Sequence, residues 1–130
     1  MSILRAVPTE AELAILHVLW ERGASTVREV HEALYEGTAT GYTTALKLLQ
    51  NMLAKGLVTR DERTRQHIYR AAVPKQRTLN ALVRILIDKT FAGSSAALAM
   101  QALDARSASR EELGQLKELI RKIERRKGRR

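Results

Sequence analysis

The stretch from residue 41 to residue 56, GYTTALKLLQNMLAKG, constrains the fold of this chain more than any other part of it. At about 100° per residue it forms an amphipathic helix between two glycines, with Tyr42 and aliphatic residues on one face. The opposite face is polar and cationic and carries no carboxylate, which suits contact with bases and phosphates in a DNA major groove. An ordinary amphipathic surface helix would show the same pattern, so the choice between these two interpretations depends on the flanking sequence. The polar face consists of Thr43, Thr44, Lys47, Asn51 and Lys55.

Two shorter helices are predicted before this stretch, after an N-terminal arm at residues 1–8. Each begins at a capping box, in which a Thr is followed three residues later by a Glu: TEAE at residues 9–12 and TVRE at residues 26–29. Gly23 ends the first helix and Gly37 follows the second. Because only a tight Gly/Thr turn separates the second helix from the third, the pattern is that of a helix-turn-helix.

A β-hairpin is predicted directly after Gly56. Residues 57–60 and 67–70 have strand composition, and the polar segment DERTRQ at residues 61–66 forms the tip between them. Three helices followed by a hairpin make a winged helix, and the wing supplies cations for phosphates or a minor groove. A solvated hairpin with ordinary surface charge is the alternative. The wing cations are Arg60, Arg63, Arg65 and Arg70.

Charge is distributed unevenly along the 130 residues, which carry a formal net charge of +9. Residues 1–74 account for +1 and residues 75–130 for +8, while within the first part residues 37–74 carry +4. The predicted third helix and wing are therefore basic and the two preceding helices are not. A surface that faces DNA would produce this division, and the overall charge favours a polyanionic partner.

The tail after Pro74 is predicted to hold three helices, so we expect a winged-helix DNA-binding domain at residues 1–74 and a helical dimerisation domain at residues 75–130. The last helix follows a third capping box, SREE at residues 109–112. The tail has too small a core to be stable alone, and pairing with a second copy suits a helix-turn-helix protein better than docking on the winged helix. The predicted interface residues are Leu79, Leu82, Val83, Leu86, Leu113, Leu116, Ile120 and Ile123. The closing RKIERRKGRR is either a solvated helix end or a further DNA contact.

No active site is apparent in the sequence. There is no Cys, and His17, His31 and His67 do not share a metal-ligand spacing, so we predict no catalytic residue, no metal and no cofactor. We expect His17 to pack in the core and His31 to lie on the surface of the second helix. No run of about 18 apolar residues and no signal pattern is present, so neither a membrane span nor export is predicted, and the expected location is the cytoplasm.

Three segments, PTEAELAILHVLWERGASTVREVHEAL, GYTTALKLLQNMLAKGLVTRD and IYRA, carry a resemblance to a known family. Over about residues 8–93, and more loosely in the tail, the chain resembles the penicillinase-repressor family, the BlaI/MecI/CopY group. The resemblance implies a homodimeric winged-helix repressor that binds a dyad operator and shuts off a resistance or stress operon. It also implies an inducing signal, often a membrane metalloprotease sensor whose activation leads to cleavage in the tail. On the family pattern, the base-reading positions fall on Thr43, Thr44, Lys47 and Asn51.

The sequence departs from the family pattern in three places. Positions 47 and 51, often Thr and Arg in the family, are Lys47 and Asn51 here, so the operator sequence is expected to differ. Protease-cleaved members carry an Asn-Phe pair in the tail, and the nearest match, Gln101–Ala102, is the candidate proteolytic site. The absence of Cys excludes copper sensing through the C-terminal cysteine cluster of some members. Two other classes remain: a non-specific, architectural nucleic-acid binder that uses the basic tail, and a winged helix used as a protein-interaction module.

Overall fold

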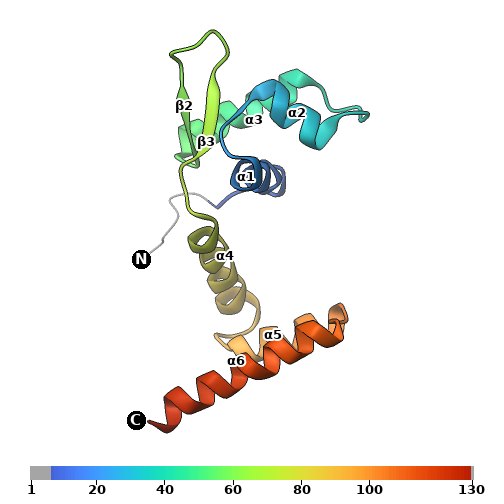
Figure 1. Ribbon diagram of the computed structural model, residues 1–130, viewed down its shortest axis with the longest axis vertical. Helices are drawn as coiled ribbons and strands as arrows, with labels where there is room; N and C mark the ends of the chain where they lie inside the picture. Colours follow the sequence, from blue (N-terminus) through green and yellow to red (C-terminus); the bar gives the residue numbers. More distant parts are fainter. Residues whose placement is uncertain (1–6, 130) are drawn as a thin grey trace. The chain divides into compact units, whose positions relative to one another are not determined.

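The computed structural model describes residues 7–129, which form six helices and a small three-stranded sheet (Figure 1). This confirms the predicted fold class, mainly α with a β-hairpin wing, in which a winged helix-turn-helix is followed by C-terminal helices. The expected arm at residues 1–8 lies almost entirely outside the described residues. In chain order the elements are α1 (Glu10–Arg22), β1 (Ser25–Thr26), α2 (Val27–Tyr35), α3 (Tyr42–Lys55), β2 (Val58–Asp61), β3 (Ile68–Ala71), α4 (Lys75–Thr90), α5 (Ser95–Ala105) and α6 (Arg110–Gly128).

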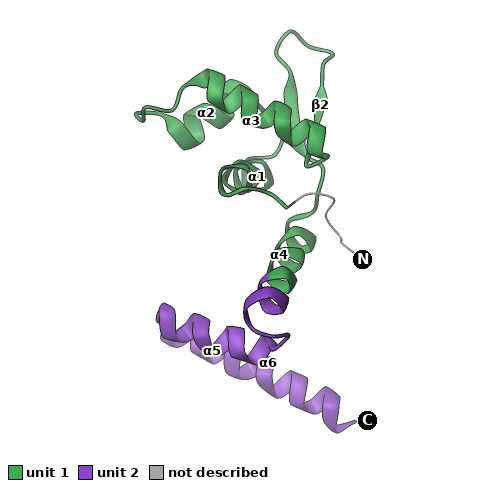
Figure 2. Ribbon diagram, turned by 180° about the vertical axis from the view of Figure 1, so that it is seen from behind, with its two compact units in different colours: residues 1–85 green, residues 86–130 purple. Residues whose placement is uncertain are grey.

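Two compact units divide the chain, residues 1–85 and residues 86–130, and Figure 2 colours them separately. The division falls inside α4, because the first turns of this helix pack on the winged helix: Thr78 and Ala81 are buried. The domain boundary expected after residue 74 remains a prediction.

The ends of the helices follow the local signals in the sequence. All three predicted capping boxes are present and are thereby confirmed. At the first, the Glu12 amide donates to the Thr9 hydroxyl over 3.2 Å and the Thr9 amide donates to Glu12 Oε1 over 2.9 Å. The third helix ends at Gly56, whose φ of 80° is left-handed and favours a residue without a Cβ.

The sheet has the strand order β1-β3-β2, and both pairings are antiparallel. Each wing strand begins one residue later than the sequence predicts, at Val58 and Ile68. The reason at the first strand is that the Leu57 amide donates to the Met52 carbonyl, over 2.9 Å, as part of the C-terminal cap of α3. The short strand β1 pairs Ser25 with Tyr69 and thereby attaches the start of α2 to the wing.

The core lies where α1, α2, α3 and the wing meet. A polar anchor at its edge is the indole of Trp20, which donates to the Val73 carbonyl over 2.9 Å and holds the chain that leaves the wing against α1. The buried hydrophobic residues of this core are Ile15, Leu16, Leu19, Val27, Val30, Ala45, Leu49, Met52, Leu57, Val58 and Tyr69.

The second unit lacks such a core. No residue from 86 to 129 is buried, and this includes every residue of α5 and α6 in that range. The chain passes from α4 to α5 through Ala92 and Gly93, with φ angles of 51° and 83°. Within residues 7–129, no helix is both long enough and apolar enough to cross a membrane.

Candidate nucleic-acid interface

The recognition-helix candidate α3 is held by its apolar face. Ala45, Leu49 and Met52 on that face are completely buried. The turn before α3 is fixed by His31, whose Nε2 lies 2.8 Å from the Thr40 carbonyl oxygen. His31 lies half-buried on α2, and its imidazole joins this helix to the turn, a contact that the sequence argument did not predict.

The polar face of α3 points away from this core. Its first four predicted members are exposed, but the fifth, Lys55, turns toward α1 and donates to the buried Glu12 carboxylate over 2.8 Å. Burial opposes ionisation of Glu12, but the hydrogen bonds from Lys55 and from the Thr9 amide prevail and lower the pKa of Glu12. Lys55 is thus already paired, whereas the exposed side chains available to DNA are Thr43, Thr44, Lys47 and Asn51.

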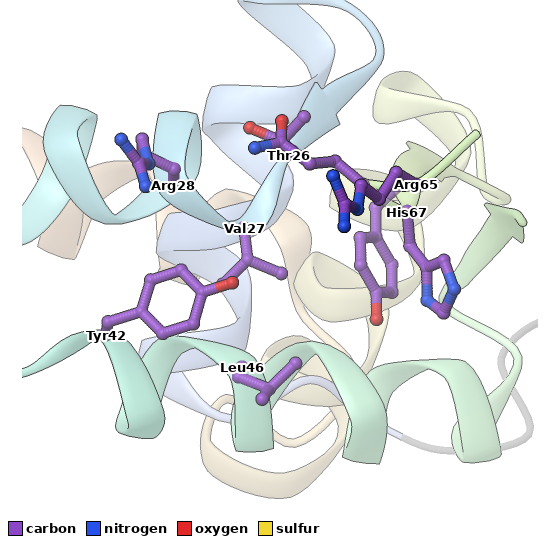
Figure 3. Close-up of a pocket in the computed structure, with 9 residues that line it drawn as sticks. Thr26, Val27, Arg28, Tyr42, Leu46, Arg65 and His67 are labelled. Atoms are coloured by element: carbon purple, nitrogen blue, oxygen red, sulfur yellow. The ribbon is translucent and has the colours of Figure 1, made fainter.

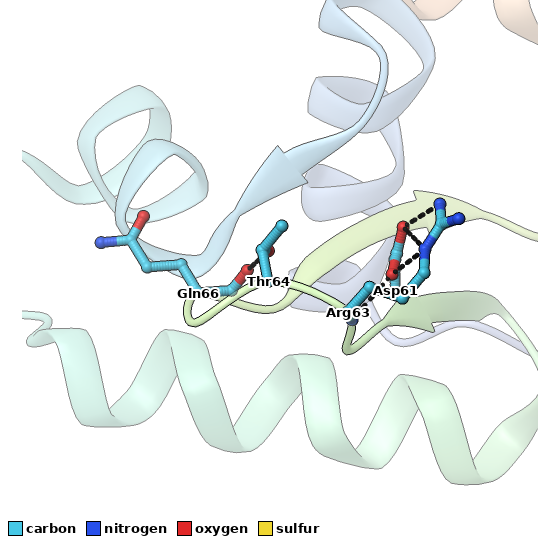
Figure 4. A network of polar contacts seen from close by, with 4 residues as sticks. All are labelled: Asp61, Arg63, Thr64 and Gln66. Carbon is cyan, nitrogen blue, oxygen red and sulfur yellow. Dashed lines mark hydrogen bonds and ion pairs between the residues drawn. The ribbon is translucent and has the colours of Figure 1, made fainter.

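At the wing tip, Arg63 is held by an intramolecular ion pair with Asp61 (Figure 4). Arg63 Nη2 lies 2.8 Å from Asp61 Oδ2, and Nε lies 3.1 Å from Oδ1. The Arg63 backbone amide also donates to Oδ1 over 2.9 Å, so the carboxylate organises the turn. The Arg63 side chain and amide lower the pKa of Asp61 to about 2, so Asp61 is a full counter-charge at neutral pH.

Arg60 faces the inside of the wing, because it pairs with the buried Tyr69 across β2 and β3. The guanidinium donates to Glu62 Oε1 over 3.2 Å, and Glu62 also lies 3.9 Å from His67. The Tyr69 hydroxyl and then the Glu62 carboxylate raise the pKa of Arg60, although the contact with Tyr69 lacks hydrogen-bond geometry. Arg60 is therefore compensated locally, like Arg63.

Arg65 and Arg70 are the wing cations whose side chains have no hydrogen bond or ion pair to any residue from 7 to 129, although Arg70 is near enough to Asp61 to help lower the pKa of that carboxyl. Arg65 lies near α3, because it lines a cleft together with Tyr42 and Leu46 (Figure 3). Tyr42, expected on the core side of α3, is 48% exposed at this edge. The structure thus brings the wing tip and the first turns of α3 together.

Arg28 is a candidate contact that the sequence argument missed. It lies in the first turn of α2, is exposed, and lines the same cleft as Arg65. The available signal was its place at the start of the helix that precedes the recognition helix, since in helix-turn-helix proteins this helix crosses the DNA backbone.

The predicted dimerisation residues lie on α4 and α6. Leu79 and Leu82 are half-buried, as is Leu116, while Ile120 is 54% exposed. The remaining members are all exposed: Val83, Leu86, Leu113 and Ile123. The candidate proteolytic site, Gln101–Ala102, lies in the interior of α5.

Comparison with known proteins identifies a family and two relatives. A family model described as penicillinase repressor matches residues 8–122. Two proteins from Mycobacterium tuberculosis, strains CDC 1551 / Oshkosh and ATCC 25618 / H37Rv, are each named transcriptional regulator BlaI. Each is 39% identical to this chain over 61 residues, which is 46% of this chain. The match spans 44% of each relative, less than half of its length.

Proposed function

We propose that this chain, which belongs to the penicillinase repressor family, is a transcriptional repressor that binds double-stranded DNA through α3 and the wing. The observation that carries the proposal is the division of α3 into a buried apolar face and an exposed polar face without a carboxylate. The family is one of repressors and not of enzymes, and the two relatives are named as transcriptional regulators.

Base reading is assigned to Lys47 and Asn51, which lie one turn apart on the exposed face of α3. A Lys ammonium favours the guanine acceptors O6 and N7, and an Asn amide forms a bidentate pair with adenine. Thr43 and Thr44, in the first turn, contact bases or phosphates. Arg65 and Arg70 contact the DNA backbone, because neither side chain forms an ion pair within residues 7–129.

The acting form is a homodimer on a dyad operator. Residues 86–129 bury no side chain completely, yet α6 presents Leu119 and Ile120 about half exposed, at 49% and 54%. Helices with this much uncovered apolar surface gain stability by covering it, and closed two-fold symmetry is the commonest solution. Two copies of α3 would then occupy successive major grooves about 34 Å apart. Occupying a promoter represses it sterically, and the resemblance suggests a resistance or stress operon.

The base-reading role is tested with Lys47→Ala and Arg65→Ala, using DNA from immediately upstream of the chain's own gene and random DNA at two salt concentrations. Lys47→Ala should cost about 1–3 kcal/mol on the specific DNA and relax base preference. Arg65→Ala should weaken both DNAs alike and reduce the salt slope by about 1. Arg77→Ala, which removes the same charge from α4, is the control. Equal losses on both DNAs for Lys47→Ala would reject base reading.

The dimer is tested by introducing a carboxylate into the apolar face of α6. Leu116→Glu and Ile120→Glu should produce monomers in light scattering, together with weak operator binding, because the carboxylate would be desolvated at the interface. Arg121→Gln changes the net charge by the same amount on the polar side of α6 and should leave a dimer. Dimers that survive both Glu substitutions would exclude this face as the interface.

A second candidate function, non-specific nucleic-acid binding, is favoured by the end of α6. Four cationic side chains there line one shallow depression: Lys122, Arg125, Arg126 and Arg129. Replacing the first three by Gln should remove most DNA binding if the chain is an architectural protein, and little if it is a repressor that reads through α3. The two functions therefore predict opposite outcomes for one variant.

Relief of repression by cleavage is the last part of the proposal. A protease needs an extended substrate, whereas Gln101–Ala102 is helical, so α5 must open before a membrane metalloprotease sensor or a protease downstream of it can cut there. No side chain of α5 is buried, and such a helix opens locally at low free-energy cost. Cleavage mapped by mass spectrometry after induction would test the position.

A further inference from the structure

A cleft with a volume of about 220 Å³ lies between the start of α2, the first turns of α3 and the wing tip. Figure 3 shows Thr26, Val27 and Arg28 on one side and Tyr42 and Leu46 on α3. Arg65 and His67 close the cleft from the wing, and Gln66 and Tyr69 complete its lining. All of these residues belong to the first unit, so three elements of one packed domain build the cleft.

The lining of the cleft attracts negative charge. It contains two guanidinium groups, on Arg28 and Arg65, and the imidazole of His67, but no carboxylate. Neither arginine has an ion-pair partner within residues 7–129, whereas His67 lies 3.9 Å from Glu62 outside the cleft. The amino-terminal end of α2 is already occupied by the Glu29 carboxylate, which accepts from the Thr26 amide over 2.9 Å, so the attraction comes from the two arginines. Because low-dielectric walls focus the field of such charges, an anion is drawn into this space.

A buried donor without a partner is the second, independent observation. Tyr69 lines the cleft with no exposed surface, and its hydroxyl has no hydrogen-bond partner among residues 7–129. The other hydroxyl at this end, that of Thr26, already accepts from the Glu29 amide over 3.2 Å. This hydroxyl lies against the Arg60 guanidinium, which can only donate a hydrogen bond, so the hydroxyl proton still lacks an acceptor, and an oxygen brought by a ligand would supply one.

We propose that this cleft binds an oxyanion, with phosphate as the model, between the two arginines and the Tyr69 hydroxyl. The volume lies below the roughly 300–1,000 Å³ typical of pockets for drug-sized ligands, which favours a small anionic group. The chemistry fits two sources: a free phosphate-like anion, or one phosphate of the DNA backbone. The second source rests on the proposed function, whereas the first does not. A DNA phosphate in the cleft would make duplex binding depend on one backbone position, whereas a free anion would create no such dependence.

The first experiment titrates the full-length protein with inorganic phosphate at constant ionic strength and follows the amide NMR signals of Val27, Arg28 and His67. Saturable shifts are expected, and Tyr69→Phe, which removes only the hydroxyl, should weaken binding at least severalfold. Arg28→Ala should do the same. Arg63→Ala, which removes a charge from the same hairpin outside the cleft, should leave the titration unchanged.

The second experiment separates the two sources with duplexes in which single phosphates are replaced by neutral methylphosphonates. If the source is DNA, one replacement should weaken wild-type binding, and Tyr69→Phe and Arg28→Ala should each abolish sensitivity to that replacement. If the source is free anion, phosphate should still bind the wild type, but no methylphosphonate position should respond to Tyr69→Phe or Arg28→Ala. The proposal is overturned if phosphate produces no saturable shift and no methylphosphonate position is sensitive to these substitutions. DNA binding that fails altogether while phosphate still binds would reject the repressor and not the cleft.

Discussion

The carboxylate of Asp61 is predicted to weaken, not support, the binding of DNA by the wing. It holds Arg63 through contacts of 2.8 Å and 3.1 Å, and its pKa of about 2 keeps it ionised throughout the neutral range. Asp61→Asn removes the negative charge, while the amide oxygen can still accept from the Arg63 backbone amide, so the turn is retained. The substitution thus releases one guanidinium, whose side chain is already 88% exposed, toward phosphates.

The size of the effect follows from the number of charges released. One additional phosphate contact makes the slope of log K against log salt steeper by about 0.9, which corresponds to on the order of tenfold tighter binding at about 0.1 M salt. The gain should be similar on random DNA and on the operator, because phosphate contacts carry no sequence information. Asp61→Asn should therefore leave the specificity, expressed as the ratio of the two affinities, close to that of the wild type.

The assay is fluorescence anisotropy with random-sequence duplex at four salt concentrations. Arg63→Ala alone should change the slope little, because Arg63 makes no phosphate contact while it is paired, although the uncovered Asp61 carboxylate should weaken binding. The double variant Asp61→Asn with Arg63→Ala should return close to wild type. The reasoning is refuted if Asp61→Asn leaves the slope unchanged, or if Arg63→Ala alone reduces the slope as much as Arg65→Ala does. The latter would mean that phosphate displaces Asp61 from Arg63 when DNA binds.

Two further predictions concern stability. Glu12→Gln should destabilise the protein by about 1–3 kcal/mol at pH 7, because it weakens a buried, charge-assisted pair with Lys55. The pKa of Glu12 is lowered on folding, so its contribution to stability is complete above the ordinary value of 4.5 and is lost as pH falls through the folded-state value. In urea unfolding, the difference in unfolding free energy between wild type and Glu12→Gln should therefore be smaller at pH 3 than at pH 7. Ala92→Gly should raise the melting temperature slightly and Gly93→Ala should lower it, because both positions have positive φ, which favours glycine. A shift of the melting temperature in the same direction for both substitutions would contradict this argument.

Local signals made much of the winged helix predictable. A capping box needs only residues three apart and a left-handed helix end needs a glycine, so the starts of α1, α2 and α6 and the end of α3 follow from neighbours in the sequence. The family resemblance, resting on the same segments, is confirmed by the match over residues 8–122. One-residue errors remained where two elements compete for a backbone group, as Leu57 shows.

Charge pairing was not predictable, because it depends on contacts that sequence spacing does not reveal. Lys55 has helical spacing with the polar face of α3, but its partner Glu12 is 43 residues away and only the packing of α1 on α3 brings them together. The pairing of Arg63 with Asp61 depends on the conformation of the wing turn. Arg28 and Tyr69 escaped notice for the same reason: three elements must meet before their shared cleft exists.

These pairings change what the basic composition means for DNA binding. In the part of the winged helix that the structure describes, counter-charges already occupy three of the predicted contacts: Lys55, Arg60 and Arg63. Few uncompensated cations remain beside α3, so sequence-independent attraction by this domain should be modest, and base contacts by Lys47 and Asn51 should contribute a larger share of the affinity. Most of the net charge instead lies in the tail, at residues 75–130. Each phosphate contact adds about 0.9 to the slope of log K against log salt. A measured slope well above the value expected from the few unpaired cations of the winged helix would therefore indicate that the basic end of α6 also contacts the DNA.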